Sequence, residues 1–458
     1  MKNNFVTMSD CYKFSHAPQY PPNTEIVSSY LESRGGVWPS TMFFGLQYYL
    51  KMIEGVQVTQ EKIDYAEPRI DACMGPGTFN REGWEHIVNA HEGRLPVRIK
   101  AVPEGMIIPI SNALMTVENT DPKCYWLTNF LETLLSKVWY TSTVATQSYY
   151  MKKDLLKYLK ETGTPEDVDF KLHDFGYRGV SSEEQAGLGG MAHLVNFKGT
   201  DTFVANEYAT DYYGADMAGF SIPASEHSTI TSWGELHEAD AYENMLDVYK
   251  GPMACVSDSF NIYNSCWDIW GDKLRDKVLN REGVTVIRPD SGDPHVVLPE
   301  ILKLLAIRFG AEKNSKGYMV LHPQVRVIQG DGIDRNSMGG ILRLLKDQRW
   351  SADNIAFGSG GGLLQKVDRD TSSYAFKCSA IRRNNVWHDV FKDPVDGGKK
   401  SKKGRLKLVG SNGHYSTVTK DSFPHAIDVL ETVFENGELI REYSFDEVRN
   451  NALVKGMK

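Results

Sequence analysis

Apolar and polar residues follow two patterns along the first part of the chain. Residues 26–31 are rich in strand formers and precede Gly35 and Gly36, so a strand is predicted there. Residues 97–102 alternate apolar and polar side chains, as a half-buried strand does. Apolar residues three and four positions apart predict helices at 43–53, at 81–90 and within 123–159. The N-terminal part is therefore predicted to be mixed α and β.

From about residue 165 a different rhythm begins, in which a short apolar stretch ends in a polar loop and a helical pattern follows. The strand-and-loop stretches lie at 168–179, 196–203, 221–230, 253–260, 284–294, 325–333 and 354–362. Their starts are roughly 30–40 residues apart, the length of a βα unit. Serial βα units imply parallel strands joined by right-handed crossovers. Six or seven of them favour either a barrel or a large doubly wound sheet.

The last of these stretches leads into four glycines within five residues. They are Gly358, Gly360, Gly361 and Gly362, grouped around Ser359. Glycine adopts positive φ easily, and a strand–loop–helix of this kind lets backbone N–H groups converge on an anion. The loop fits neither the GxGxxG nor the Walker A pattern. A flexible turn without a ligand therefore stays open as the alternative.

Charged and polar residues gather at the predicted C-terminal ends of the strands, where βα folds bind their ligands. They are His173, Asp174, Phe175, Arg178, Asp201, Glu226, His227, Ser257, Asp258, Arg288, Asp290, Ser291, Gln329, Gly330, Asp331 and Gly332. A single aspartate there is often only a helix cap. Arg288 is more informative, because a guanidinium beside apolar Ile287 is costly to bury unless an anion pairs with it. Cations, carboxylates and a glycine loop together suit a phosphorylated sugar with Mg²⁺.

Composition narrows the class of protein. The chain has 458 residues, 41% of them hydrophobic, and a net charge of −8, which argues against nucleic acid as the main partner. Its six cysteines are scattered without a CxxC pair, as expected for reduced thiols in the cytoplasm. The N-terminus lacks the apolar core of a signal peptide, and no apolar run approaches the ~18 residues of a membrane span. A cytoplasmic protein without a membrane partner is expected.

Motifs spread over nearly the whole chain resemble those of the nicotinamide phosphoribosyltransferase family, which belongs to the type II phosphoribosyltransferases. They are DCYKFSHAPQYPPNT, YRGVSS, VNFKGTDT, EHSTI, VSDS, IRPDSG, VIQGDG, IAFGSGGGLLQK, SKKGRL and YSFDE. The departure lies at residues 35–42, where GGVWPSTM stands in place of a longer charged insertion. This departure concerns the local surface and not the site.

The resemblance implies a fold and a division into domains. The fold would be α/β, with an irregular (β/α) barrel of the type II phosphoribosyltransferase kind at residues 161–390 as the catalytic domain. Residues 1–160 would form an N-terminal α+β portion. Residues 391–458 would pack with that portion to complete a second, mixed α+β domain.

The resemblance also implies a reaction. Phosphoribose would pass from phosphoribosyl diphosphate to nicotinamide, giving nicotinamide mononucleotide and diphosphate in the first step of NAD salvage. Such an enzyme is a glycosyltransferase of the pentosyltransferase kind and works as a homodimer with shared active sites. Mg²⁺ would act through the diphosphate, and ATP would stimulate the reaction by phosphorylating His227, whose ring Glu226 could orient.

Individual roles carry over from the same resemblance. Phe175 would stack on the pyridine ring, Tyr12 of a second subunit would cover its other face with Asp10 nearby, and Asp201 would accept a hydrogen bond from the carboxamide. The residues around the phosphates and ribose would be Arg178, His227 and Arg288 at diphosphate, Asp290 at the ribose hydroxyls, and Gly330, Asp331, Gly360, Gly361 and Arg369 at the ribose phosphate, with Arg34 as a weaker candidate. His227, Arg288 and Asp290 are the expected catalytic residues.

Three other functions compete with this interpretation. A sister enzyme acting on nicotinate is disfavoured by Asp201, because two carboxylates at ~4 Å repel each other by several kcal/mol at a partly buried site. A non-enzymatic signalling protein on the same scaffold does not explain the charged residues at the strand ends. An aldolase or isomerase barrel would want a catalytic lysine or glutamate at a strand end, and no lysine stands out there.

Overall fold

The computed structural model describes residues 4–395, 400–411 and 413–453, and the chain divides into two compact units. The first, here called the sheet unit, runs to Thr146 and takes in Asp211–Gly214 and Asp368–Leu453. The second, the barrel unit, comprises Gln147–Thr210 and Ala215–Val367. Each unit is described separately below.

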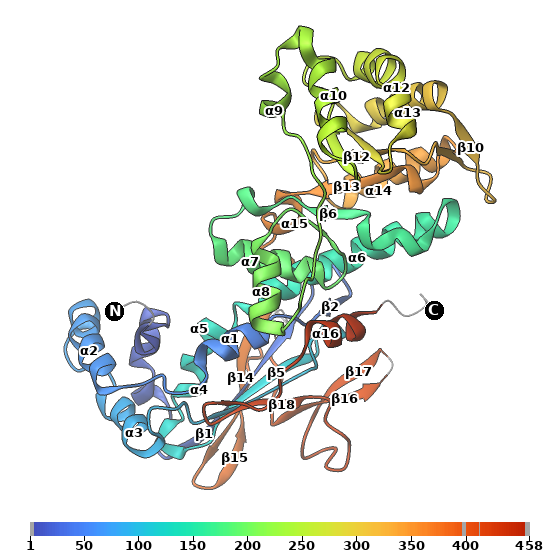
Figure 1. The fold of residues 1–458 in the computed structure, drawn as a ribbon. Coiled ribbons are helices and arrows are strands. Elements are labelled where there is room, and N and C mark those ends of the chain that lie inside the picture. The colour runs from blue at the N-terminus through green and yellow to red at the C-terminus, as the bar shows by residue number, and fades with distance from the viewer. Residues whose placement is uncertain (1–3, 396–399, 412, 454–458) are drawn as a thin grey trace. The chain divides into compact units, whose positions relative to one another are not determined.

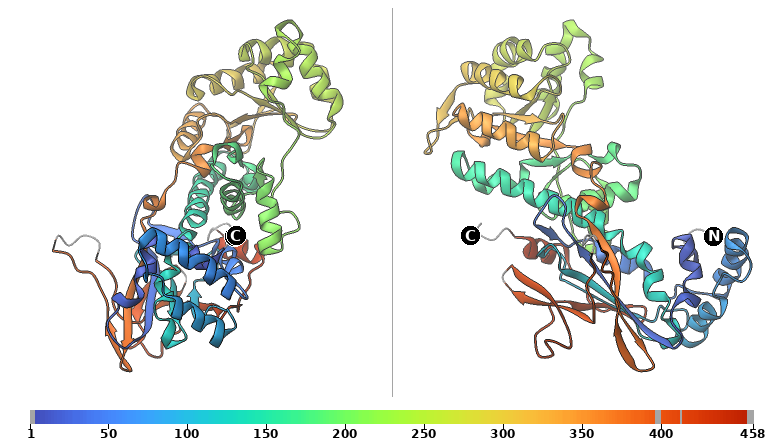
Figure 2. Two further views of the ribbon diagram at one scale, coloured as in Figure 1. Left: turned by 90° about the vertical axis from the view of Figure 1, so that its left-hand side faces the viewer. Right: turned by 180° about the vertical axis from the view of Figure 1, so that it is seen from behind.

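The sheet unit is built on a seven-stranded antiparallel sheet in the order β15-β14-β1-β5-β3-β18-β19 (Figure 1). Its strands are β1 (Thr24–Ser33), β3 (Val97–Ala101), β5 (Ala113–Asn119), β14 (Tyr374–Arg383), β15 (Val386–Asp389), β18 (Glu431–Glu435) and β19 (Glu438–Leu439). In β1, Val27, Tyr30 and Leu31 are fully buried. Strands from both ends of the chain thus share one sheet, and Figure 2 shows it from two further sides.

Short strand pairs and helices complete this unit. The further strands are β2 (Ser40–Met42), β4 (Ile107–Pro109), β16 (Leu406–Ser411) and β17 (His414–Thr419). The α-helices are α1 (Leu46–Ile53), α2 (Gln60–Met74), α3 (Arg81–His91), α4 (Leu127–Phe130), α5 (Glu132–Leu135) and α16 (Phe445–Ala452). The 3₁₀ turns are η1 (Phe5–Thr7), η2 (Cys11–Ser15), η3 (Ala17–Gln19), η4 (Pro122–Cys124) and η10 (Arg369–Thr371). The strands and helices predicted at 26–31, 43–53, 81–90 and 97–102 are all present.

The barrel unit contains six parallel strands in the order β7-β6-β13-β12-β9-β8. They are β6 (Leu172–Asp174), β7 (Gly199–Thr200), β8 (Met253–Val256), β9 (Thr285–Arg288), β12 (Val325–Gln329) and β13 (Ile355–Ser359). Between the two edge strands, Phe220 makes a parallel bridge to Gly199 of β7, and Ala224 makes one to Ala254 of β8. Residues 220–224 therefore close the ring, which decides between the two predicted architectures in favour of an irregular barrel. The stretch at 221–230 supplies this bridge instead of a full strand.

Helices and turns connect the strands of the barrel unit. The helices are α7 (Glu183–Leu194), α9 (His227–Thr231), α10 (Glu238–Val248), α11 (Ile262–Asn264), α12 (Arg275–Asn280), α13 (Pro294–Phe309), α14 (Arg335–Asp347) and α15 (Gly361–Leu364), with α6 (Val138–Thr162) and α8 (Val204–Tyr213) crossing the unit boundary. The other elements are η5 (Pro165–Phe170), η6 (Tyr177–Gly179), η7 (Glu235–His237), the π-helix η8 (Ser265–Lys273), η9 (Ala352–Asn354) and the strand pair β10 (Ala311–Lys313) and β11 (Met319–Leu321). Ser182 caps α7 by accepting from the Gln185 N–H.

The barrel interior is hollow. A cavity of about 850 Å³ runs past Ala224, Ala254 and Ala356, whose small side chains leave the centre of the ring open. Residues at the carboxyl ends of strands, such as Phe175 and Arg288, line it together with residues near their amino ends. A small ligand therefore has room inside the ring of strands.

The domain boundaries differ from the expected ones. Residues 374–390 were assigned to the barrel, but β14 pairs with β1 and β15 pairs with β14, so the barrel unit ends at Val367. The barrel unit also begins at Gln147 instead of 161, within α6. Of the expected C-terminal portion, residues 396–399, 412 and 454–458 lie outside the described residues.

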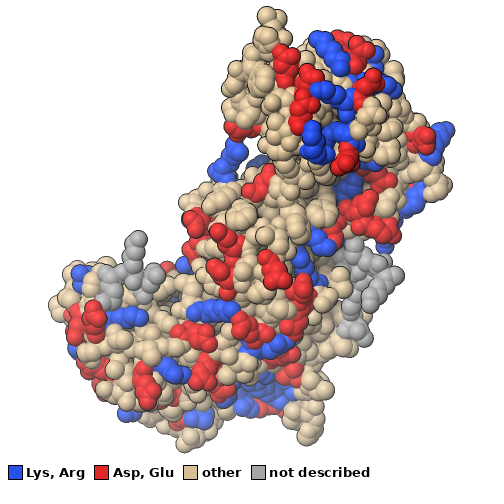
Figure 3. Space-filling view, viewed as in Figure 1, with Lys and Arg blue, Asp and Glu red and all other residues tan. Residues whose placement is uncertain are grey.

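Two surface properties bear on partners. Within the described ranges, no helix is both long and apolar enough to cross a membrane. On the face shown in Figure 3, basic and acidic side chains are interspersed over both units.

Candidate active site

Phe175 follows β6 directly and is packed against strand β13 and the loop after β12 at the mouth of the barrel. A Cβ atom placed on Gly358 of β13 would lie 1.9 Å from Cε2 of the Phe175 ring. One placed on Gly330, just after β12, would lie 3.3 Å from the same atom and 3.6 Å from Oδ1 of Asp290. The structure therefore brings Phe175, Gly330 and Asp290 together from three parallel strands, as their positions at strand ends predicted.

The reason for glycine in the loop at 358–362 differs from the predicted one. None of its four glycines, all of which lie in the described range, has a positive φ. Gly358 makes room for the Phe175 ring, and a Cβ on Gly362 would lie 2.5 Å from the Ile333 carbonyl oxygen. The explanation from positive φ is wrong, and close approach of other atoms is the reason for glycine at these two positions.

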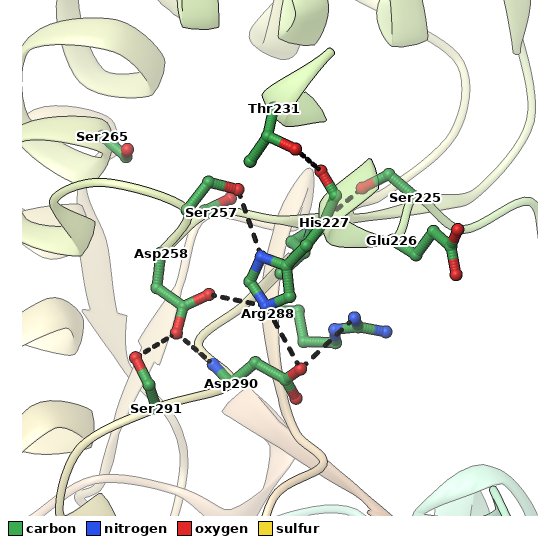
Figure 4. A network of polar contacts seen from close by, with 12 residues as sticks. Ser225, Glu226, His227, Thr231, Ser257, Asp258, Ser265, Arg288, Asp290 and Ser291 are labelled. Atoms are coloured by element: carbon green, nitrogen blue, oxygen red, sulfur yellow. Dashed lines mark hydrogen bonds and ion pairs between the residues drawn. The ribbon is translucent and has the colours of Figure 1, made fainter. Parts of the chain in front are cut away.

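His227 lies at the centre of a polar network (Figure 4). It is the first residue of α9, and its Nδ1 is 3.2 Å from the Ser259 hydroxyl. Its Nε2 is 3.5 Å from Oδ2 of Asp290 and 3.8 Å from Oδ1 of Asp258. The ring is therefore oriented by groups on the loops after β8 and β9.

Glu226 does not take the orienting role suggested for it. It caps α9, and its carboxylate accepts from the Ser228 hydroxyl. In Figure 4 its side chain points away from the His227 ring. Asp258 and Asp290 are the carboxylates that face this ring.

Asp258 fixes the loop that carries Asp290. Its Oδ2 accepts from the Asp290 N–H at 2.9 Å and from the Ser291 hydroxyl. Its Oδ1 is buried and has no hydrogen-bond partner among the described residues. The sequence placed Asp258 at a strand end but gave no reason to single it out, because its partners come from the next βα unit.

Arg288 ends β9 with its side chain 17% exposed. Its Nη2 lies 3.6 Å from Oδ2 of Asp290, and its Nε is buried without a hydrogen-bond partner in the described part of the chain. A buried guanidinium with donors to spare is suited to binding an anion. This agrees with the argument made from its apolar sequence neighbours.

Asp201 follows β7 and lines the cavity together with Phe175 and Ser221. The Ser221 hydroxyl donates to Oδ1 of Asp201, and the Asp201 N–H donates to the Asp174 carbonyl oxygen at 2.9 Å. The side chain of Asp201 is thus held at the cavity wall as a hydrogen-bond acceptor. Ser221 was missed as a site residue, because only the closing segment of the ring brings it to Asp201.

Comparisons with known proteins agree with this geometry. The model of the nicotinate phosphoribosyltransferase (NAPRTase) family matches residues 170–438, and that of the nicotinamide phosphoribosyltransferase N-terminal domain matches residues 4–99. A nicotinamide phosphoribosyltransferase from Xanthomonas campestris pv. campestris is 49% identical, over 98% of each chain. The chain belongs to the nicotinate phosphoribosyltransferase family. It is accordingly a phosphoribosyltransferase, one of the glycosyltransferases, as its motifs indicated.

One further relative and one solved structure extend this likeness in sequence and in fold. A nicotinamide phosphoribosyltransferase from Acinetobacter baylyi is 34% identical, over 97% of this chain and 96% of its own. The crystal structure of nicotinate-nucleotide pyrophosphorylase from Pyrococcus furiosus has the same fold, with a TM-score of 0.62 at 16% identity over 99% of this chain and 95% of its own. The type II phosphoribosyltransferase architecture is therefore established for this chain.

The remaining predicted site residues lie on other elements than Phe175, His227 and Arg288 do. Arg178 is exposed on η6, and Asp331, the second residue after β12, is exposed as well. Gly360 and Gly361 open α15 after β13. Four more, Asp10, Tyr12, Arg34 and Arg369, belong to the sheet unit, and their roles stay predictions. Tyr12 is 57% exposed, so its ring is accessible.

Proposed function

We propose that this phosphoribosyltransferase uses nicotinamide and phosphoribosyl diphosphate to make nicotinamide mononucleotide and diphosphate. The choice of nicotinamide rests mainly on Asp201, whose carboxylate is a hydrogen-bond acceptor at the wall of the cavity next to Phe175. A carboxamide NH₂ donates to such an oxygen, whereas the carboxylate of nicotinate would be repelled by it. The two relatives from Xanthomonas campestris and Acinetobacter baylyi, both nicotinamide phosphoribosyltransferases, support the same choice.

The proposed ring site combines stacking with one polar contact. Phe175 offers an aromatic face at the mouth, and its position is fixed by close contact with Gly330 and Gly358. The pyridine ring stacks there with its amide on Asp201, so that the ring nitrogen is aimed at the anomeric carbon of the ribose. This contribution is mainly positioning of the nucleophile.

The charged residues act on the leaving group. The transition state is oxocarbenium-like, and negative charge gathers on diphosphate as the glycosidic bond breaks. Arg288 and His227, with Arg178, stabilise that charge more strongly in the transition state than in the ground state. Asp290 lies between His227 and Arg288 and accepts from the ribose hydroxyls in this scheme.

Mg²⁺ fits this arrangement as an ion carried by the diphosphate. Oδ1 of Asp258, which is buried and accepts no hydrogen bond from the described residues, and the carboxylate of Asp290 are oxygen ligands of the kind that Mg²⁺ prefers. When bound, the ion neutralises charge on the diphosphate oxygens.

ATP is proposed to stimulate the reaction through His227. The side chain of this histidine is 46% exposed, so a nucleotide can reach it. A ring nitrogen bonds to the γ-phosphorus as the bond to ADP breaks, and water later takes up the phosphoryl group. The carboxylates of Asp258 and Asp290 near Nε2 stabilise positive charge on the imidazole ring. The alternative role of His227 is that of a plain diphosphate ligand, and the labelling experiment separates the two roles.

The assembly proposed is a homodimer with shared sites in the cytoplasm. Asp10 and Tyr12 of one subunit would complete the pyridine site of the other, with Arg34 as a weaker contact to diphosphate. Arg369 would bind the ribose phosphate next to Gly360 and Gly361. All six cysteines are free thiols, which supports a reducing compartment.

The substrate choice is tested by a direct assay. Purified protein with phosphoribosyl diphosphate and Mg²⁺ is given nicotinamide or nicotinate, and the mononucleotide formed is measured. Nicotinamide is expected to be the better substrate, with faster turnover when ATP is added. Equal or better use of nicotinate would overturn the proposal.

The phosphohistidine is tested separately from turnover. Incubation with γ-radiolabelled ATP is expected to give an acid-labile, base-stable label on the protein, and His227→Asn should abolish it. The matched control is His237→Asn, because His237 is exposed and also has an aspartate partner, Asp240. Label that survives in His227→Asn would leave His227 as a diphosphate ligand only.

A further inference from the structure

The sheet unit holds a second group of metal-ligating side chains, outside the active site. Among the described residues, His86, His91, Asp121 and Cys124 place one ligand atom each within 4.8 Å of one another. His86 and His91 belong to α3, whereas Asp121 caps η4 and Cys124 ends it. Asp121 lies 35 residues after His86 and 30 after His91 in sequence, and the two pairs meet where α3 packs against η4.

The two imidazoles converge on one oxygen atom. Nε2 of His86 is 2.8 Å and Nε2 of His91 is 2.6 Å from Oδ2 of Asp121. The side chains of His86, His91 and Asp121 are 21%, 25% and 18% exposed, whereas Cys124 is fully buried. An ion can therefore enter from solvent between the imidazoles and meet the sulfur at the base of the group.

Other contacts hold these ligands in place and leave the converging atoms available. Oδ1 of Asp121 accepts from the Lys123 N–H at 2.8 Å, which turns Oδ2 towards the histidines. Residues three apart on a 3₁₀ turn lie on one side, so Asp121 and Cys124 face the same way. The carbonyl oxygen of Asp121 accepts from the Asn119 amide and the Cys124 N–H. Such outer hydrogen bonds are what metal sites use to orient their ligands.

The sulfur of Cys124 separates this group from an ordinary His–Asp–His cluster. Two hydrogen bonds to one carboxylate would account for the histidines and Asp121, but they leave the thiol without a role. Within the described residues, the Cys124 Sγ has no hydrogen-bond partner. Two imidazole nitrogens, a thiolate and a carboxylate form a ligand set that suits Zn²⁺.

We propose that His86, His91, Asp121 and Cys124 bind one Zn²⁺ ion in a tetrahedral site that joins α3 to η4. Zinc bonds of roughly 2.0–2.3 Å require ligand atoms roughly 3.3–3.8 Å apart. The two N–O contacts, at 2.8 and 2.6 Å, lengthen to reach this geometry, and the other ligand atoms, all within 4.8 Å of one another, adjust to it. The Cys124 thiol loses its proton to solvent, and each histidine keeps its proton on Nδ1 so that Nε2 can bond to the ion.

The site is tested on the full-length protein after removal of metals with a chelator. Equilibrium dialysis against Zn²⁺, without phosphoribosyl diphosphate, is expected to show one ion per chain. Co²⁺ in its place should give the strong visible bands of a tetrahedral site and a thiolate-to-metal band in the near ultraviolet. His91→Asn and Cys124→Ser should each weaken zinc binding by at least about tenfold, because loss of an outer hydrogen-bond partner alone costs roughly 10–100-fold.

Three controls tie the signal to this site. Cys11 and Cys73 have sulfurs 3.5 Å apart and are the other thiols that could share an ion, so Cys11→Ser/Cys73→Ser should keep the bands. His227→Asn should keep them, which excludes the active site, and so should His237→Asn. Cys124→Ala is measured beside Cys124→Ser, because Cys124 is fully buried and a serine hydroxyl there could disturb the fold. Circular dichroism of each metal-free variant shows whether it folds.

Stability gives a second, independent readout. Zn²⁺ should raise the unfolding temperature of the wild type, since a ligand that binds only the folded state stabilises it, and should not raise that of His91→Asn. Absence of stoichiometric binding by the wild type would overturn the proposal. Bands that persist in folded Cys124→Ala, or that vanish in Cys11→Ser/Cys73→Ser, would overturn it as well.

Discussion

Asp174 shows how burial sets the chemistry of a single residue at the barrel mouth. It is fully buried at the end of β6, and burial raises the pKa of its carboxyl to about 7. The Gly176 N–H donates to its Oδ1 at 2.7 Å and opposes that rise. In the unfolded chain the same carboxyl loses its proton near pH 3.8. Between these two values the folded protein holds a proton that the unfolded chain does not.

This difference predicts how stability depends on pH. Because the folded state binds more protons between about pH 4 and pH 7, the contribution of Asp174 to stability falls as pH rises through that window. Each pKa unit corresponds to about 1.4 kcal/mol. Asp174→Asn should flatten the pH dependence of the free energy of unfolding, measured with denaturant at several pH values. Asp276→Asn, whose side chain is 91% exposed, should keep the wild-type slope, and an unchanged slope in Asp174→Asn would contradict the assignment.

Asp201 is the residue on which substrate choice depends. Its carboxylate is held by the Ser221 hydroxyl at the cavity wall. Asp201→Asn should lower kcat/KM for nicotinamide by roughly tenfold or more, since a hydrogen bond to a charged group is worth about 1.5–3 kcal/mol. Steady-state kinetics with both pyridines measure this, and thermal unfolding shows that the fold is kept. Unchanged kinetics would mean that Asp201 serves only the local structure, and Asp276→Asn is again the control.

Strands β6, β12 and β13 show how secondary-structure elements prepare the site. The Phe175 ring leaves β6 and occupies space that a side chain on Gly358 of β13 would fill. The alignment of Phe357 with Leu172 in the parallel register brings Gly358 level with His173, close to this ring. One glycine in one strand therefore decides where the aromatic face of the neighbouring loop lies.

Gly358→Ala tests this packing. The added methyl group should displace the Phe175 ring and raise KM for nicotinamide, with a stability loss of about 1–3 kcal/mol from overpacking. The matched control is Gly339→Ala in α14, where an added Cβ meets nothing within 4 Å. It should leave KM unchanged and be neutral or stabilising by up to about 1 kcal/mol. Normal KM in Gly358→Ala would show that the ring position does not matter for binding.

At the scale of the whole molecule, the proposed sites need two chains. Tyr12 and Arg288 belong to different units of one chain, and the homodimer proposal has them serve one site from different subunits. Tyr12→Ala and Arg288→Ala should each lose most activity. Mixed and allowed to exchange, they should recover about a quarter of wild-type activity, because half of the dimers in a two-fold assembly are hybrids with one intact site. Recovery is measured as product formation after mass spectrometry has verified exchange, and no recovery would contradict shared sites.

The sequence by itself determined the order of the βα units and the residues at their ends. Hydrophobic periodicity and motif spacing are local properties of the chain, so they located the six parallel strands. They also located the residues at the carboxyl ends of these strands, among them Phe175, Asp201, His227, Arg288 and Asp290. Parallel strands bring their carboxyl ends to one edge, so these residues were expected to lie together before any contact was known. The long motifs are local sequence properties as well, so they identified the family without knowledge of any contact.

Only the tertiary structure decided which of these residues touch. The pairing of β1 with β14, the closing bridges at Phe220 and Ala224, and the bond between Ser221 and Asp201 all join segments far apart in sequence. So does the meeting of α3 with η4 at the proposed zinc site. Periodicity reports how one segment faces a core, but it carries no information about which distant segment packs there. Contacts of that kind depend on the complete packing of the chain.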